Sequence, residues 1–297
     1  MEKINLKSLI VEQKERFLAK EGLLPREVLV TLGELIEQRE IVFLSGVRRC
    51  GKSSLMRLCC DELGARKGVS RSDILYLNFE DERLLDFSAK DFEKVLEVFD
   101  ELRGRPGRAW FFLDEIQNIP GWERVVRRMH DEGYHIFLTG SNSHLLSIEF
   151  GTHLTGRYIQ IELFPFGFDE ICRFQKVLPD RSGLINTQAE AGILRLFTSY
   201  LETGGFPEYQ SDPDPDILRR TFDDIIFRDV ITRYGIREIK AFRELARYLF
   251  TNMTREASLN SLASAIGIKS GMSVKTWIGY LEDSYLLGSL CQYEYSM

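Results

Sequence analysis

The sequence predicts an α/β fold, in which a three-layer domain with a five-stranded parallel sheet is followed by a wholly helical region. Two observations lead to this prediction. Short apolar runs alternate with helical patterns, and most of the runs are continuously apolar, as strands covered on both faces require. Between about residue 168 and residue 283 the patterns are helical. The expected strands are residues 41–45, 74–79, 109–113, 135–139 and 158–163.

Helical patterns fill the intervals between these runs. The first covers residues 52–63, where an apolar face ends at Gly64. Ser88 can cap the second helix, which ends by Gly104, and Pro120 can open the third. The alternation predicts crossover connections between parallel strands. Later helices are expected near residues 189–203, 215–234, 239–252, 259–266 and 273–283.

Composition limits the class of protein. The chain has 297 residues, enough for two domains and a small third, and 44% hydrophobic with 28% charged residues is typical of an ordered protein. No apolar run approaches the roughly 18 residues of a membrane span. The five cysteines are too few for a disulfide scaffold, so a cytoplasmic location is expected. A net charge of −6 argues against general polyanion binding.

Residues 46–53, Gly-Val-Arg-Arg-Cys-Gly-Lys-Ser, fit the pattern G-x-x-x-x-G-K-[ST] between an expected strand and an expected helix. Such a loop curls so that its N–H groups point at phosphate oxygens, and the helix adds its positive end. Lys52 would reach the β- and γ-phosphates, and Ser53 would ligate Mg²⁺. The residues expected to hold ATP are Gly46, Val47, Arg48, Arg49, Cys50, Gly51, Lys52, Ser53 and Ser54.

A second motif places two carboxylates, Asp114 and Glu115, directly after the apolar run 109–113. A parallel strand delivers such side chains to the edge of the sheet where ligands bind. Asp114 would hold Mg²⁺ through water, and Glu115 would orient and deprotonate the attacking water. The strand 74–79 separates the loop from Asp114, as in additional-strand ATPases, and there is no N-K-x-D motif to favour a GTPase.

Two later positions complete the expected catalytic set of Glu115, Lys52, Asn142 and Arg157. Ser141 and Asn142 follow the fourth strand, and either could touch the γ-phosphate and the attacking water; the alternative is that one of them caps the next helix. Arg157 precedes the fifth strand, where an arginine of a ring-forming ATPase faces the neighbour's nucleotide. The alternative is a surface ion pair with a local carboxylate.

These motifs make the chain similar to the AAA+ superfamily, and more narrowly to prokaryotic and archaeal ATPases in which an AAA domain is followed by a winged helix and usually a nuclease-like domain. The resemblance implies Mg²⁺-dependent ATP hydrolysis, ATP and ADP as ligands, a homo-oligomer as a candidate assembly, and no membrane. The chain ends at Met297, where a nuclease-like domain would follow, so nuclease activity is not implied. Further matching stretches are residues 77–84, 138–143, 154–157, 164–170, 204–208 and 227–230.

The domain prediction has three parts: a P-loop AAA+ ATPase domain with an N-terminal helix over 1–170, a helical lid over 171–218, and an incomplete winged-helix-like domain over 219–297. The last part contains a helix–turn–helix pattern followed by a first wing strand over 289–295. A wing is a hairpin, and the return strand is missing. Either a partner chain supplies that strand or the sequence is a fragment of a longer protein, and we favour the fragment.

DNA is a candidate partner because of the helix–turn–helix pattern. However, the expected reading helix offers only Lys275, beside Glu282 and Asp283, and phosphate contacts need Lys or Arg. The alternative is a winged helix that is structural or contacts another protein. The function expected first is ATP hydrolysis coupled to domain or subunit movement. Two other functions stay open: a nucleotide-dependent signalling switch, and a DNA-binding regulator with little turnover. Glu115 favours hydrolysis.

Overall fold

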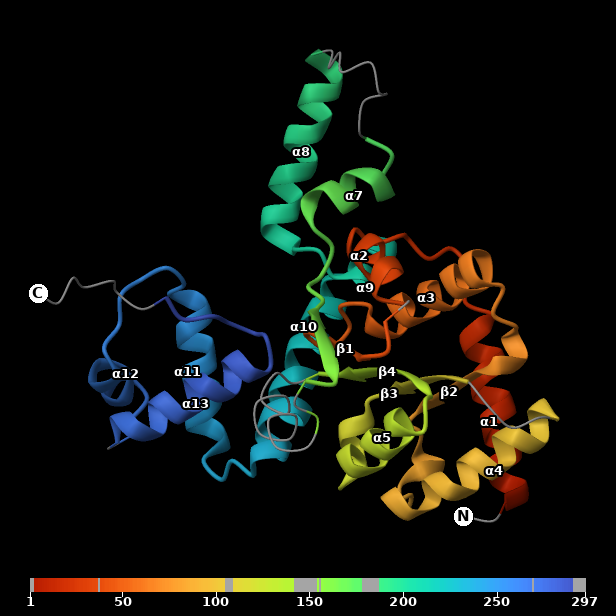
Figure 1. Ribbon diagram of the computed structural model, residues 1–297. Coiled ribbons are helices and arrows are strands. Elements are labelled where there is room, and N and C mark those ends of the chain that lie inside the picture. Colours follow the sequence, from red (N-terminus) through yellow and green to blue (C-terminus); the bar gives the residue numbers. More distant parts are fainter. Residues whose placement is uncertain are drawn as a thin grey trace, which may run out of the picture.

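A computed structural model of the chain describes residues 3–36, 38–104, 109–141, 154, 156–177, 187–268 and 270–290, with backbone alone at 187–189. Five strands alternate with helices before residue 163, and helices follow (Figure 1). The strands are β1 (Ile41–Ser45), β2 (Ile74–Asn78), β3 (Trp110–Asp114), β4 (His135–Gly140) and β5 (Tyr158–Glu162). The α-helices are α1 (Lys3–Leu18), α2 (Val28–Leu35), α3 (Lys52–Lys67), α4 (Phe92–Arg103), α5 (Trp122–Asp131), α7 (Phe168–Phe174), α8 (Thr187–Thr203), α9 (Pro207–Ser211), α10 (Pro215–Asp224), α11 (Ile239–Thr251), α12 (Leu259–Ala265) and α13 (Gly271–Asp283).

Short helical turns complete the description. Four are 3₁₀ turns, η1 (Arg71–Asp73), η2 (Glu82–Leu84), η3 (Ala89–Asp91) and η4 (Ile116–Asn118), and one is a π-helix, η6 (Ile225–Thr232). The π-helix directly continues α10, so the single helix expected over 215–234 is in fact two kinds of helix. A π-helix is rare and is often found at functional sites.

The sheet is parallel throughout, in the order β2-β3-β4-β1-β5. This confirms the expected five-stranded parallel sheet. Along β1, Phe43 contributes to the core on one face, whereas Val42 and Leu44 contribute to the core on the other. Both faces are therefore covered, which is why the strands are continuously apolar. Helices α4 and α5 pack on the first face, and α2 and α3 pack on the second.

Helix α1 covers the edge of the sheet at β2. Its first turns add Leu6 and Leu9 to one core, and Phe17 at its end belongs to the other core. Between them, the side-chain amide of Gln13 forms two hydrogen bonds with the backbone of Asn78 in the edge strand β2. Its Oε1 accepts from Asn78 N at 2.7 Å, and its Nε2 donates to Asn78 O at 3.3 Å, as the backbone of a neighbouring strand would do. The helix thereby protects an edge that would otherwise be open to pairing with another chain.

The helix expected over residues 52–63 was predicted to end at Gly64, and this prediction is wrong. Helix α3 continues through Gly64 to Lys67 and ends at Gly68, which has φ 63°. An internal glycine costs a helix only about 1 kcal/mol, and burial of residues such as Leu63 offsets that cost. The expected end at Gly104 holds, since Gly104 is the C-cap of α4. Ser88 caps the 3₁₀ turn η3, and the N-cap of α4 itself is Asp91.

The C-terminal helices have a core of their own. Phe242, Leu262, Val274, Trp277 and Leu281 pack together in it, and Figure 1 shows α11, α12 and α13 gathered away from the sheet. The two helices of the expected helix–turn–helix are present as α12 and α13. Helix α8 projects from the body beside α7.

Residues 291–295 of the expected wing strand lie outside the described residues, and no strand is assigned at 289 or 290. The predicted domain boundary at residue 170 falls within α7, and the one at 218 falls within α10. No helix in the described part of the chain combines the length and apolar character of a bilayer span.

Candidate nucleotide-binding site

The loop between β1 and α3 depends on Gly46 and Gly51. Gly46 has φ 147°, and a Cβ there would lie 2.0 Å from the carbonyl oxygen of Leu163. Gly51 has φ 105° and is the N-cap of α3. The loop therefore needs glycine at both positions to turn from the strand into the helix. Its N–H groups stand at the positive end of a 16-residue helix, which favours a bound anion.

Lys52 lies inside this loop. Its Nζ donates to the carbonyl oxygens of Gly46 at 2.8 Å and Val47 at 3.0 Å, and the residue is 5% exposed. These carbonyls hold the ammonium group over the loop. Phosphate oxygens carry more charge than carbonyls and would compete well for the same donors.

Asp114 ends β3 and is buried. Its Oδ2 accepts from Tyr76 Oη at 2.7 Å, and its Oδ1 accepts from Thr139 Oγ1. The Thr139 hydroxyl also accepts from Glu115 N at 2.9 Å. Burial, together with the Asp114 charge, raises the pKa of Tyr76, so this phenol stays a hydrogen-bond donor. Three adjacent strands thus fix the carboxylate.

Glu115 has a left-handed backbone with φ 54°, uncommon for a residue with a side chain. Its carboxylate accepts from Gln117 Nε2 and lines a cavity. Burial raises the pKa of Glu115 above its ordinary value, although Lys52 opposes the shift. A carboxylate with a raised pKa is a stronger base than an exposed one.

Ser141 follows β4 and is 1% exposed, and its Oγ lies 3.4 Å from Asp229 Oδ1. Asn142, the other candidate at this position, lies outside the described residues. Arg157 is half-buried beside β5, and its Nε lies 3.5 Å from Asp131 Oδ1. The structure therefore shows the ion pair with a local carboxylate that was the alternative role for Arg157. Arg157 does not line the cavity beside the phosphate-binding loop.

The two arginines of the loop join it to the later helices. Arg49 Nη1 donates to Glu208 of α9 at 2.8 Å, and its Nη2 donates to Asp224 of α10 at 2.9 Å. Arg48 is paired with Asp229 of the π-helix η6. Each helix segment from α9 to η6 therefore contributes a carboxylate to the phosphate-binding loop.

The stretch Gly-Gly-Phe-Pro-Glu at 204–208 lies directly against the loop. Gly205 O accepts from Phe166 N at 2.7 Å, and a Cβ on Gly205 would lie 2.0 Å from Phe166 O, so only glycine fits. Pro207 Cγ would lie 3.7 Å from a Cβ on Gly51. The motif thus brings Glu208 to Arg49 by close backbone packing.

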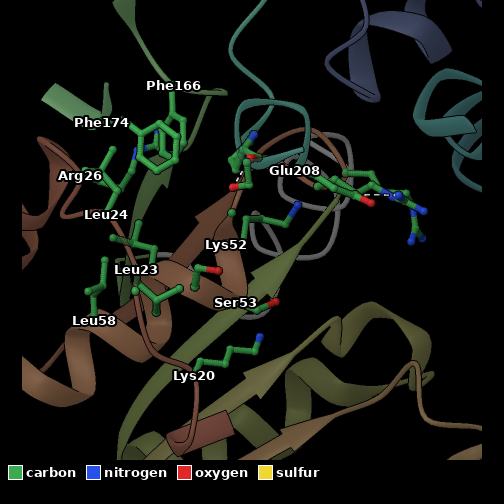
Figure 2. Close-up of a pocket in the computed structure, with 18 of the residues that line it drawn as sticks. Lys20, Leu23, Leu24, Arg26, Lys52, Ser53, Leu58, Phe166, Phe174 and Glu208 are labelled. Atoms are coloured by element: carbon green, nitrogen blue, oxygen red, sulfur yellow. Dashed lines mark hydrogen bonds and ion pairs between the residues drawn. The ribbon is translucent and has the colours of Figure 1, made fainter. Parts of the chain in front are cut away.

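A cavity of about 450 Å³ lies beside the loop. Lys52, Ser53 and Glu115 line it with Arg48, and the apolar residues Leu23, Leu24, Leu58, Phe166 and Phe174 line its other part. Figure 2 shows these apolar side chains to one side of Lys52 and Ser53. Of the nine residues expected to hold ATP, Arg49, Gly51 and Ser54 also line the cavity, whereas Val47 and Cys50 are buried in the core beside it.

Ser53 and Asp114 suit Mg²⁺ by their chemistry, since both offer hard oxygen ligands. Each Asp114 oxygen accepts one hydroxyl hydrogen bond and keeps a lone pair for a water. Ser53 lines the cavity, whereas Asp114 is 1% exposed and is not among the lining residues. The described residues form no cluster of three or more His, Cys, Asp or Glu able to hold a metal. The set therefore fits an ion that keeps waters and phosphates as its other ligands.

Residues 38–172 match the family described as AAA domain. This segment is therefore identified as an AAA domain. It holds the sheet, the phosphate-binding loop and the Asp114–Glu115 pair. Residues 194–297 match a second family, described as a domain of unknown function.

Two uncharacterised proteins are similar to this chain over most of its length. An uncharacterised protein of Methanocaldococcus jannaschii is 31% identical over 264 residues, covering 86% of this chain and 57% of the relative. An uncharacterised protein of Haemophilus influenzae is 30% identical over 275 residues, covering 89% of this chain and 66% of the relative. The chain therefore spans less than two thirds of the length of these relatives.

Two solved structures are similar to the chain at low sequence identity. The Aeropyrum pernix ORC1 protein in complex with DNA is 13% identical and has a TM-score of 0.40, with 91% of this chain and 87% of that chain covered. The Thermotoga maritima RuvB Holliday junction branch migration motor is 17% identical and has a TM-score of 0.39, with 90% of this chain and 91% of that chain covered.

The sequence does not reveal the contacts that several residues make around the site. Tyr76 is an ordinary strand residue, and Thr139 and Gln117 lie in stretches that resemble the family, but no pattern indicates their hydrogen bonds to Asp114 and Glu115. Asp229 lies within the stretch at 227–230 that resembles the family, but its sequence position gives no sign of the loop 181 residues earlier. Such partners become visible only when the chain is folded.

Proposed function

We propose that the AAA domain binds ATP with Mg²⁺ beside the loop at 46–53 and hydrolyses it. One observation carries the proposal. Lys52, Ser53 and Glu115 come from two different β–α connections and line one cavity. A cation for the phosphates, a hydroxyl ligand for the metal ion and a base for the attacking water therefore face the same space.

The apolar part of the cavity is proposed to hold the nucleobase. Leu23 and Leu24 come from the segment between α1 and α2, Leu58 comes from α3, and Phe166 and Phe174 come from the region after β5. Apolar and aromatic side chains suit the faces of a purine. Arg26 Cζ lies 4.7 Å from the centre of the Phe166 ring and fixes that ring in place.

Ser53 and Asp114 would hold the metal ion, Ser53 directly and Asp114 through water. When bound, Mg²⁺ supplies positive charge that stabilises the phosphate oxygens. Lys52 would exchange its carbonyl partners for phosphate oxygens, keeping the same place in the loop.

Glu115 is proposed as the base that takes a proton from the attacking water. Its raised pKa suits this role, and its backbone and carboxylate are both held, by Thr139 and Gln117. Ser141 or Asn142 would contact the γ-phosphate from the end of β4. Arg157 is proposed to act on the nucleotide of a neighbouring subunit of a homo-oligomer, since it is outside the cavity of its own chain.

Nucleotide state is proposed to move the later helices, because Arg49 joins the loop to Glu208 and Asp224. We keep the division into an ATPase domain over 1–170, a lid over 171–218 and a winged-helix-like domain over 219–297 as a proposal, with a cytoplasmic location. A switch with slow turnover is the second candidate, and these same ion pairs favour it. DNA stays a weaker candidate partner, since Lys275 is the one cation on α13.

The test is phosphate release by the parental protein with ATP, measured with and without Mg²⁺ and DNA at several protein concentrations. We expect release that requires Mg²⁺ and that stays above the release of Lys52→Ala. Release by the parent no faster than by Lys52→Ala would overturn hydrolysis at this site. Binding without release would favour the switch.

A further inference from the structure

Arg48 is held on one edge by two carboxylates. Its Nε donates to Asp229 Oδ2 at 2.9 Å, and its Nη2 donates to Asp229 Oδ1 at 3.3 Å and to Glu80 Oε1 at 2.9 Å. Asp229 thus makes the two-pronged contact that a planar guanidinium favours. Burial alone would lower the pKa of Arg48, but the Asp229 and Glu80 charges raise it, so the group is always cationic.

The other edge of the Arg48 guanidinium is available. Within the part of the chain that the structure describes, Nη1 makes no hydrogen bond or ion pair, and Arg48 lines the cavity together with Lys52 and Glu115. A guanidinium has five N–H donors in a rigid plane. Fixing Nε and Nη2 leaves the two N–H donors of Nη1 for a ligand at the phosphate end of the cavity.

Asp229 is a buried carboxylate from outside the AAA domain. It is 2% exposed and belongs to the π-helix η6, and the groups that face it are Arg48, Ser141 and Arg233. Its Oδ1 lies 3.4 Å from Ser141 Oγ at the end of β4. The carboxylate therefore touches both the phosphate-binding loop and the strand end where the γ-phosphate is expected.

We propose that Arg48 is a catalytic residue that contacts the γ-phosphate of ATP in its own chain through Nη1, and that Asp229 is the positioning residue that holds it there. This inference rests on the proposed function. It implies that turnover requires the AAA domain and η6 together, because Asp229, the residue that fixes Arg48, belongs to η6. A cation fixed before the reaction stabilises developing charge without reorganising.

The experiment is a double-mutant cycle with Arg48→Ala and Asp229→Asn, read as kcat and as the affinities for ADP and the non-hydrolysable analogue AMP-PNP. We expect Arg48→Ala to lower kcat about 10²-fold or more and to reduce the preference for AMP-PNP over ADP. Asp229→Asn should lower kcat about tenfold, with affinity for ADP within about threefold of the parent. In the Arg48→Ala background, Asp229→Asn should change kcat by less than about twofold, because Asp229 acts through Arg48.

Asp223→Asn is the matched control. Asp223 lies on the neighbouring helix α10, its side chain is 45% exposed, and its ion-pair partner in the described part of the chain is Arg243, so the variant removes one carboxylate that does not pair with the loop. It should keep the parental kcat. An Arg48→Ala protein within about threefold of the parental kcat would overturn the inference, as would an equal Asp229→Asn effect in both backgrounds.

The inference and the proposed function fail in different ways. A rise in kcat on Asp229→Asn would make Asp229 a restraint on Arg48 and would overturn its positioning role while leaving ATP hydrolysis standing. A parental protein that binds neither ADP nor AMP-PNP would overturn the proposed function itself.

Discussion

Arg26 and Glu170 form a buried ion pair across 144 residues of sequence, with Arg26 Nε 2.8 Å from Glu170 Oε1. Both side chains are 7% exposed. Arg26 Nη1 also donates to Cys50 O at 3.2 Å, and Nη2 donates to Phe164 O at 2.8 Å. One side chain therefore ties the segment before α2 to the phosphate-binding loop and to the chain after β5.

Arg26→Ala should destabilise the protein by about 3–5 kcal/mol, because it leaves the Glu170 carboxylate buried without its partner. The free energy of urea unfolding measures this. Arg173→Ala is the matched control, since Arg173 lies on the same helix as Glu170 but pairs with Glu27 at the surface, where ion pairs contribute little. Equal effects of the two substitutions would contradict the assignment of a structural role to the buried pair.

The same pair predicts a dependence on pH. Burial would raise the pKa of Glu170, but hydrogen bonds from Arg26 and from the backbone N–H groups of Gly167 and Glu27 hold it below its ordinary value. A folded pKa below the unfolded one gives stability above about pH 4.3 that is lost as pH falls through the folded pKa. The stability difference between the parent and Glu170→Gln should therefore be larger at pH 6 than near pH 3. A difference that grows on acidification would contradict this.

Gly205→Ala should lower stability by roughly 1–3 kcal/mol, because a Cβ 2.0 Å from Phe166 O forces the backbones apart. It should also weaken ATP binding, since Glu208 and Pro207 would move from the loop. The matched control is Gly279→Ala in α13, where nothing lies within 4 Å of the new Cβ, and this change should stabilise slightly. Urea midpoints and nucleotide titrations on both variants provide the comparison.

The sequence was sufficient to predict the five strands and their parallel pairing, and the structure places Lys52 and Glu115, which follow two of these strands, in the lining of one cavity. These predictions rest on local patterns, because the carboxyl ends of parallel strands meet at one edge of the sheet. The contacts of Arg26 with Glu170 and of Arg48 with Asp229 join residues 144 and 181 positions apart, and no local spacing indicates them. The passage of α3 through Gly64 was missed because burial outweighed helix propensity.

Glu115→Gln should keep ATP bound and lower phosphate release about 10²-fold or more, because an amide cannot accept the proton of water. Gln117 can still contact the new side chain, so the local structure should persist. Single-turnover release compared with equilibrium binding separates the two effects. Parental turnover in Glu115→Gln would remove Glu115 from the role of base.

Arg157 gives a prediction about assembly. Specific activity should rise with protein concentration if Arg157 reaches a neighbour's nucleotide, and an arginine supplied in this way can contribute about 10³–10⁵ in rate. Mixing Arg157→Ala with Lys52→Ala should then restore part of the activity, provided that the parental protein oligomerises. Concentration-independent activity without rescue would leave Arg157 with its local partner Asp131.

The most direct test of the central claim is an equilibrium titration of the parental protein and of Lys52→Ala with ATP in the presence of Mg²⁺. We predict that the parent saturates at one nucleotide per chain and that Lys52→Ala binds about 10²-fold more weakly or not at all, because the cation over the loop is lost. Thermal unfolding of both proteins checks that the fold is kept. If folded Lys52→Ala bound ATP as tightly as the parent, the nucleotide would not lie at the loop of residues 46–53.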